Sequence, residues 1–172
     1  EQFSGRKIKI VLGCGGNRDQ SKRSVIGKIA NKYCDKIYLT DDNPRKENPK
    51  KIRKTIKKNI EKNKLFETSN RKKAIEKAVI HLSSNDILVV SGKGHENIQD
   101  YGKRKFFFSD RDTILNSIKL KNNLLSNNLK INILNENMDA KKISKTTKLK
   151  NASINSKEIK KNDIFFAIRG KN

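Results

Sequence analysis

Three short polar segments of the chain each follow a run of apolar residues that predicts a buried β-strand. The segments are Gly13–Asp19 (GCGGNRD), Asp41–Arg45 (DDNPR) and Gly92–Glu96 (GKGHE). Helical patterns separate the runs, and strands that alternate with helices are typical of a mainly parallel α/β sheet with right-handed crossovers. Because ligands of such sheets bind outside the carboxyl ends of the strands, we expect the three segments to form one site.

The spacing of the apolar residues predicts the individual elements. Strands are expected at 7–12, 36–40, 65–67, 87–90 and 105–108, and helices at 21–33, after the Asn48-Pro49 cap, after Ser69 or Asn70, and from the capping box at 109–112. The run 87–90 is continuously apolar, so it is interpreted as the central strand, covered on both faces. The first helix is expected to bury Val25, Ile26, Ile29, Ala30 and Tyr33.

The composition of the chain changes near residue 122. Residues 122–130 are rich in Asn, Ser and Lys and are interpreted as a linker after a first domain at 1–121. Beyond it, a weak strand is expected at 131–134 and a stronger one at 164–168. Segment 131–172 has too few apolar residues to close a core alone, so we expect it to be the truncated start of another domain. The chain lacks an initiator Met, and we expect it to be part of a longer protein.

The charge of the chain first suggests a nucleic-acid partner, because 41 Lys and Arg against 18 Asp and Glu give a net charge of +23. Most of these cations are lysines on predicted helix faces, whereas base readout favours Arg and single-strand binding favours interleaved aromatic residues. Nucleic acid is therefore not the expected partner, although a basic nucleic-acid-binding α/β module stays open as an alternative.

Other classes of protein are excluded by what the sequence lacks. No apolar run approaches the length of a membrane span, so no membrane partner is expected. Cys14 and Cys34 lack the spacing of metal ligands and are interpreted as reduced thiols of a cytoplasmic protein. The triphosphate-binding pattern G-x-x-x-x-G-K-[ST] does not occur, so neither ATP nor a metal is expected to bind within this chain.

The glycine segment differs from a dinucleotide-binding fingerprint at one position. Asp41 lies roughly where a ribose-binding acid would be, but the third glycine of the fingerprint would fall at residue 18, where the chain has Arg18. A nicotinamide-cofactor domain is therefore a disfavoured alternative. Backbone amides at the helix start and the Arg18 guanidinium instead favour a carboxylate or phosphate.

The other two segments add complementary groups. Pro44 restricts Asn43 to an extended or turn geometry and holds Arg45 ready for bidentate pairing. Lys93, His95 and Glu96 follow a strand with two glycines that permit close approach of the backbone. Guanidinium groups and carboxylates in one site suit a ligand that carries both carboxylate and ammonium groups.

In this order and with these intervals, the three segments, Lys22-Arg23 and the Ser109-Asp110-Arg111 helix start resemble the C-terminal domain of MurE-type Mur ligases over about 7–121. The resemblance implies an α/β fold, with a Rossmann-like, mainly parallel sheet that has helices on both faces. The tail at 153–170 is similar to the opening of a MurF-type ligase, which would make 131–172 the truncated start of a second ligase.

The resemblance also implies a function. The domain would bind the amino acid that an ATP- and Mg²⁺-dependent ligase adds to UDP-N-acetylmuramoyl-L-alanyl-D-glutamate, and the ATP-binding and uridine-binding domains would lie outside this chain, which alone should be inactive. Arg45 indicates meso-diaminopimelate, and a lysine-adding Mur ligase domain is the alternative. Arg18, Asn43 and Arg45 would contact carboxylates, and Gly92 and Glu96 the distal ammonium group. The implied substrate-binding residues are Arg18, Asp42, Asn43, Arg45, Gly92 and Glu96.

Overall fold

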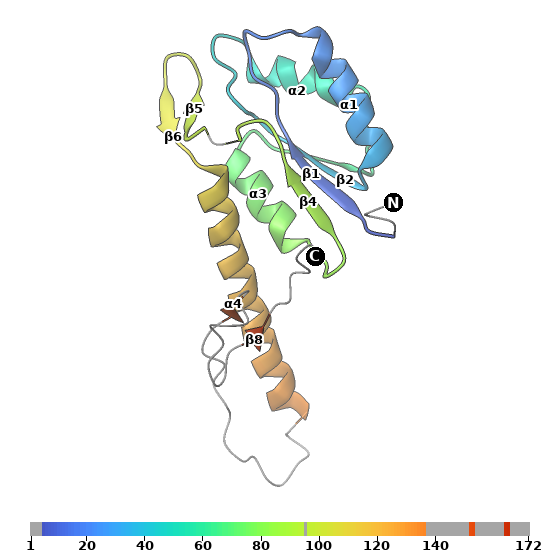
Figure 1. Cartoon of the computed structure of the whole chain (residues 1–172), viewed down its shortest axis with the longest axis vertical. Helices are drawn as coiled ribbons and strands as arrows, with labels where there is room; N and C mark the ends of the chain where they lie inside the picture. The colour runs from blue at the N-terminus through green and yellow to red at the C-terminus, as the bar shows by residue number, and fades with distance from the viewer. Residues whose placement is uncertain (1–4, 95, 137–151, 154–163, 166–172) are drawn as a thin grey trace, which may run out of the picture. The chain divides into compact units, whose positions relative to one another are not determined.

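A parallel four-stranded sheet is the central element of the first part of the chain, as the computed structural model shows (Figure 1). The structure describes residues 5–94, 96–136, 152–153 and 164–165. The strands are β1 (Ile8–Leu12), β2 (Lys36–Leu39), β3 (Leu65–Glu67) and β4 (Ile87–Val90), in the spatial order β3-β2-β1-β4. The helices are α1 (Ser21–Tyr33), α2 (Pro49–Lys57), α3 (Arg71–Ile80) and α4 (Asp110–Glu136). The predicted fold class is confirmed.

Helices cover both faces of this sheet. Leu12, Ile37 and Leu39 point to the face covered by α1 and α2, and form one apolar core with them. Val11 and Tyr38, which alternate with those residues along the strands, point to the face covered by α3 and the start of α4. The two inner strands are therefore buried on both sides, as expected for a parallel sheet.

The predicted helix caps are confirmed. The Asn48 side chain accepts a hydrogen bond from the backbone amide of Lys50 at 2.9 Å, and Pro49 is the first residue of α2. Asn70 caps α3 in the same way through the amide of Lys73, also at 2.9 Å. Both caps satisfy donors that a helix start leaves unpaired, and they fix where the two helices begin.

The predicted buried face of α1 is wrong in part. Ala30 is buried, but Val25, Ile29 and Tyr33 are 53%, 53% and 60% exposed. The reason is that α1 packs on α2 through Gly27, where a Cβ atom would lie 2.2 Å from the carbonyl oxygen of Ile56. This close approach turns the glycine toward its neighbour and leaves the larger apolar side chains outside the described core.

Gly27→Ala should therefore destabilise the chain. The added methyl group meets backbone rather than a flexible side chain, so α1 and α2 must separate, at a cost of about 1–3 kcal/mol in the free energy of unfolding. Urea unfolding followed by circular dichroism measures this. Lys28→Ala, at the next and exposed position of the same helix, is the matched control and should change stability by less than about 0.5 kcal/mol. Equal stability of the two variants would contradict the packing argument.

The strand predicted to be central lies at an edge. β4 pairs only with β1 among the described strands, and Val89 is 42% exposed while Leu88 and Val90 pack against the α3 core. The predicted cover of both faces is wrong at Val89 as well, because an apolar run alone shows neither how many strands lie beside it nor what covers its faces. The inner strands are instead β1 and β2.

A hairpin follows β4 and was only half predicted. β5 (Ile98–Asp100) pairs antiparallel with β6 (Lys105–Phe107), and the sequence indicated only the second strand. β5 was not predicted because it contains one apolar residue, Ile98, between Asn97 and Gln99, and so shows no pattern typical of a strand. The next predicted element is confirmed, because the Ser109 hydroxyl accepts from the amide of Asp112 at 3.2 Å at the start of α4.

The chain divides into two compact units, Glu1–Ile118 and Lys119–Asn172. α4 continues to Glu136, so the strand predicted at 131–134 is wrong and the predicted linker is helical. In the second unit β7 (Ala152–Ser153) pairs in parallel with β8 (Ile164–Phe165), and the rest of the tail prediction lies outside the described residues. The described helices include none that is long and apolar enough to cross a membrane.

Candidate functional site

The three polar segments meet at the carboxyl ends of β1, β2 and β4. The amide of Gly16 donates to the carbonyl of Asn43 at 2.8 Å, which joins the first segment to the second. Gly92 lies close to both, since a Cβ atom there would be 3.2 Å from Asp42 Oδ2 and 3.3 Å from the carbonyl oxygen of Gly13. The prediction that the segments form one cluster is confirmed.

Glycine is required where the first two segments touch. A Cβ atom on Gly16 would lie 1.9 Å from the carbonyl oxygen of Pro44, inside any possible contact distance. Gly13 has the same restriction, because its Cβ would lie 2.9 Å from the carbonyl of Thr40. The two loops therefore fit together backbone against backbone.

Asn43 joins the second segment to the third. Its Nδ2 donates to Glu96 Oε2 at 2.6 Å, and its Oδ1 accepts from Lys93 Nζ at 3.1 Å and from the amide of Asp100 at 2.9 Å. Asn43 and Lys93 are buried, whereas Glu96 is exposed. One amide thus holds a surface carboxylate in place from inside the site.

Arg45 adopts a left-handed backbone with φ of 52°, which is uncommon for a residue other than glycine. Its amide donates to the carbonyl of Asp100 at 2.9 Å, and its Nη1 donates to the carbonyl of Gly16 at 2.8 Å. These bonds fix the backbone and one edge of the guanidinium. Because arginine has five N–H donors, the group keeps others for an acidic ligand.

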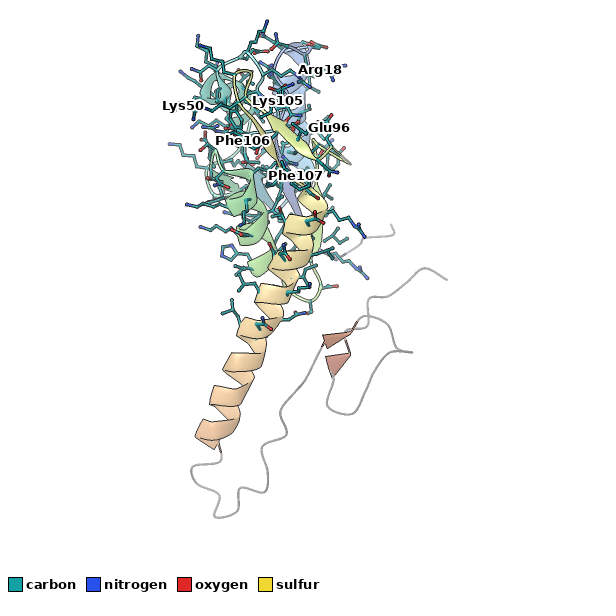
Figure 2. The ribbon with its side chains drawn as sticks, turned by 90° about the vertical axis from the view of Figure 1, so that its left-hand side faces the viewer. Arg18, Lys50, Glu96, Lys105, Phe106 and Phe107 are labelled. Carbon is teal, nitrogen blue, oxygen red and sulfur yellow. The ribbon has the colours of Figure 1, made fainter. Side chains whose placement is uncertain are left out.

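Arg18 lies beside Arg45. A Cβ atom placed on Gly15 would lie 2.8 Å from Arg45 Nη1 and 3.7 Å from Arg18 Cγ. Arg18 is exposed, and its guanidinium makes no hydrogen bond or ion pair with the part of the chain that the structure describes (Figure 2). Two arginine side chains therefore flank one glycine, at a place that suits a carboxylate.

Asp42 is the buried carboxylate of the site, at 7% exposure. Burial raises its pKa, although the Arg71 and Lys93 charges act in the opposite direction. Its Oδ1 has no hydrogen-bond partner among the described residues. A buried acceptor without a partner is costly, so this oxygen is a natural contact for a donor on a ligand.

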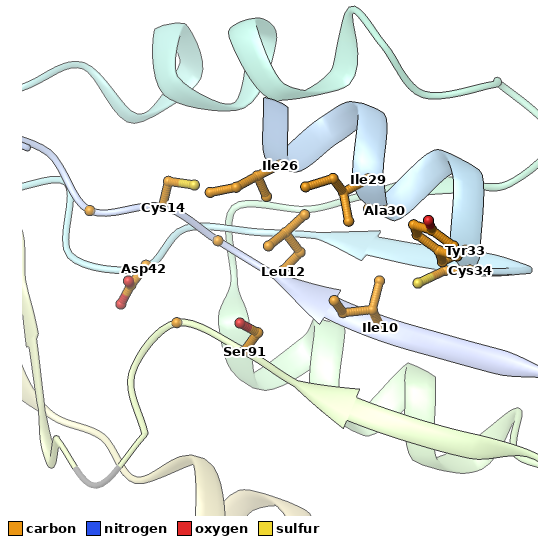
Figure 3. A pocket seen from close by; sticks show the side chains of 13 residues that line it. Ile10, Leu12, Cys14, Ile26, Ile29, Ala30, Tyr33, Cys34, Asp42 and Ser91 are labelled. Carbon is orange, nitrogen blue, oxygen red and sulfur yellow. The ribbon is translucent and has the colours of Figure 1, made fainter. Parts of the chain in front are cut away.

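A cavity of about 390 Å³ lies beside Asp42 between α1 and the sheet (Figure 3). Asp42, Ser91 and Gly92 line one end of it, and the other end is apolar, with Ile29 and Tyr33 on its wall. A second cavity, of about 650 Å³, is lined by Arg45, Tyr101 and Gly102 among others. In these two cavities, the polar end of the first and the arginine side of the second are the parts that suit a charged amino acid.

Three ion pairs with buried arginines support the site, and the sequence analysis missed them. Arg23 donates to Glu47 at 2.9 Å and 3.0 Å and to the carbonyl of Gly15 at 3.2 Å, which holds the glycine segment against the chain after Arg45. Arg23 was part of the motif named in the sequence analysis, so a role for this residue could be expected. No feature of the sequence near Glu47 indicates that it is the partner of Arg23.

A second pair explains Asp41. This residue is 4% exposed and forms an ion pair with Arg53 of α2, which also bonds Glu67 of β3 at 3.0 Å. The Tyr101 hydroxyl donates to Asp41 Oδ2 at 3.1 Å. Since both carboxylate oxygens are engaged inside the protein, Asp41 cannot serve as a ribose-binding acid, and a nicotinamide-cofactor site loses its main support.

The third pair, Arg71 with Asp110, contacts Ser91, the residue before Gly92. Arg71 Nε and Nη2 donate to the two oxygens of Asp110 at 2.8 Å and 2.7 Å, and Nη2 also donates to the carbonyl of Ser91 at 2.9 Å. The Arg71 side chain is 0% exposed and the Asp110 side chain 7%. This pair ties the starts of α3 and α4 to the end of β4.

Of the predicted residues, Asp42, Asn43, Arg45, Gly92 and Glu96 come together through direct contacts, and Arg18 joins them at Gly15. His95 lies outside the described residues. Cys14 and Cys34 are free thiols. Within the described ranges, no three His, Cys, Asp or Glu side chains are grouped so as to hold a metal ion.

The fold is that of an α/β domain with a parallel sheet, in which the glycine loop and the Asp-Asn-Pro-Arg loop meet at the carboxyl ends of the strands. A family model described as "Mur ligase, glutamate ligase domain" matches residues 1–94. The chain belongs to the Mur ligase family and corresponds to its C-terminal domain.

Known relatives agree with this membership. The chain is 49% identical over 114 residues to the UDP-N-acetylmuramoyl-L-alanyl-D-glutamate–2,6-diaminopimelate ligase of Rickettsia rickettsii. The matched residues are 66% of this chain and 24% of that protein. The corresponding ligase 1 of Clostridium acetobutylicum is 39% identical over 118 residues (69% and 24%). A solved structure of such a ligase is 32% identical, with a TM-score of 0.63 over 67% of this chain and 24% of that one. The chain thus spans about a quarter of the relatives it matches.

Proposed function

We propose that this chain is the amino-acid-binding domain of an ATP-dependent ligase that adds meso-diaminopimelate to UDP-N-acetylmuramoyl-L-alanyl-D-glutamate in the cytoplasm. The observation that carries the proposal is the arrangement of charges: Arg18 and Arg45 flank Gly15, and Asn43, from the same loop as Arg45, holds Glu96. This arrangement matches an amino acid with carboxylate and ammonium groups. The relatives, whose names state diaminopimelate, support the same substrate.

The domain's part in the reaction is binding and orientation. Arg45 and Arg18 would pair with a carboxylate and Glu96 with the distal ammonium group, so that the other amine is presented to the acyl group. ATP and Mg²⁺ would activate that acyl group, and the described residues include no cluster that fits a metal. We assign ATP and Mg²⁺ to other domains of the ligase, because the sequence lacks the triphosphate-binding pattern G-x-x-x-x-G-K-[ST].

Diaminopimelate is favoured over lysine by the cations. The two amino acids differ by a second carboxylate, and that group needs a cationic partner where it binds. Arg45 is already fixed at its backbone and at Nη1, so little order is lost when it pairs. A lysine-adding ligase would have no use for this preorganised guanidinium.

The test is to join this chain to ATP-binding and uridine-binding domains of a ligase and to measure product formation. With the UDP-linked dipeptide and ATP, the joined protein should use diaminopimelate at least about tenfold more efficiently than lysine. The 172-residue chain alone should neither hydrolyse ATP nor form product.

Three outcomes would contradict the proposal. Preference for lysine would move the protein to the lysine-adding alternative. ATP turnover by the chain alone would mean that it binds the nucleotide itself. Binding of single-stranded RNA with a steep salt dependence, together with indifference to diaminopimelate, would favour the nucleic-acid alternative.

A further inference from the structure

The orientation of the Asn43 amide is determined by partners that can act in only one way. Lys93 Nζ and the backbone amide of Asp100 can only donate, and both contact Oδ1, at 3.1 Å and 2.9 Å. The Glu96 carboxylate, when ionised, can only accept, and it contacts Nδ2 at 2.6 Å. The three contacts agree, so the oxygen of the amide faces the protein and the nitrogen faces Glu96.

Lys93 is unusual among the lysines whose burial the structure describes, because it is buried, at 3% exposure. Its ammonium group also donates to the backbone carbonyl of Ile98, at the start of β5. Burial lowers the pKa of Lys93, while the negative charges of Asp42 and Glu96 raise it. A lysine is almost never buried unless it has partners, and here the partners are parts of the site.

We propose that Lys93 is a positioning residue for substrate recognition, which sets the Asn43 amide so that its NH₂ group can bind a substrate carboxylate while it holds Glu96. The inference rests on the proposed function, because it assumes that the ligand is an amino acid with carboxylate groups. Lys93 itself does not touch the ligand; it acts through Asn43.

The geometry supplies the reason. An amide nitrogen carries two hydrogens, and Glu96 is the acceptor for one of them among the described residues. The second hydrogen is available to a carboxylate that is also bound by the arginines beside Gly15. If the amide rotated by 180°, its oxygen would face both Glu96 and the substrate carboxylate, and repulsion would replace both bonds. The charged donor at Oδ1 prevents this rotation.

A double-mutant cycle in the joined ligase tests the proposal. Lys93→Met should raise KM for diaminopimelate about tenfold, with kcat within about twofold, because a charge-assisted bond is lost outside the reacting centre. Asn43→Ala should raise KM at least as much. The double variant should be little worse than Asn43→Ala, since the direct hydrogen bond from Lys93 to a ligand-binding side chain is the one to Asn43. Lys50→Met, on the exposed first turn of α2, is the matched charge control and should leave KM unchanged (Figure 2).

The outcomes separate this inference from the proposed function. An unchanged KM in Lys93→Met, or losses that add fully in the double variant, would overturn the role of Lys93 and leave the ligase assignment intact. An unchanged KM in Asn43→Ala would contradict the binding site itself. No diaminopimelate-dependent product from the unaltered joined protein would contradict the proposed function.

A measurement without any substitution covers the case in which Lys93→Met fails to fold. In the unaltered chain, the side-chain amide protons of Asn43 should exchange with water more slowly than those of Asn97, which is exposed. Exchange as fast as that of Asn97 would show that the Asn43 amide is not held by its partners, and this result would overturn the proposal.

Discussion

Replacement of Arg45 by alanine in the joined ligase should lower kcat/KM for diaminopimelate about ten- to a hundredfold and change kcat/KM for lysine little. A hydrogen bond between charged groups contributes about 1.5–3 kcal/mol, and about 1.4 kcal/mol corresponds to a factor of ten. Lysine lacks the second carboxylate and so cannot lose this bond. Steady-state kinetics with both amino acids measures the difference.

The lysine reaction is an internal control for the structure of the loop. Arg45 Nη1 also bonds the carbonyl of Gly16, so its removal could loosen the glycine segment and lower activity with any substrate. Equal losses for the two amino acids would therefore show that Arg45 supports the loop and does not recognise the ligand. Glu96→Gln should weaken both substrates, because both present a distal ammonium group.

Arg71→Met should lower the free energy of unfolding by about 3–5 kcal/mol, because it leaves the Asp110 carboxylate buried without its partner. Urea unfolding of the 172-residue chain measures this. Arg111→Met is the matched control, since Arg111 is the next residue of α4 after Asp110 and is exposed. The control should change stability by less than about 0.5 kcal/mol.

The double variant Arg71→Met/Asp110→Leu distinguishes the cost of an unpaired charge from the value of the pair. Removing both charges should restore much of the lost stability, as buried ion pairs replaced by apolar side chains commonly do. If the double variant is as unstable as Arg71→Met, the loss comes instead from the bond between Arg71 and the carbonyl of Ser91.

The sequence predicted those parts of the structure that depend on local signals. Asn48 and Asn70 cap helices as their positions indicate, and the apolar runs predicted where the strands β1 and β2 lie. The glycine and Asp-Asn-Pro-Arg segments meet because each follows a parallel strand. The order of the strands and the exposed face of α1 could not be predicted, since both depend on which distant elements lie alongside.

The residues of the site could likewise be predicted where they lie in short local motifs, and their distant partners could not. Asn43, Arg45 and Glu96 lie in compact motifs, and their types already indicate ionic recognition. The partners that hold the site lie far away in the sequence: Arg71 and Asp110 are 39 residues apart, and Asp41 pairs with a helix residue that looks like any surface cation. Asp41 was compared with a ribose-binding acid because its burial is not visible in the sequence.

The contact between Gly16 and the Pro44 carbonyl has a consequence for how this site can evolve. No side chain of any size fits at Gly16 while Pro44 keeps its place. The Asp-Asn-Pro-Arg loop and the glycine loop before α1 therefore depend on each other. A substitution that changes the backbone of one loop requires that the other loop has changed first. Changes of substrate are therefore expected to arise by substitution of side chains such as Arg45, while the backbone of the two loops stays the same.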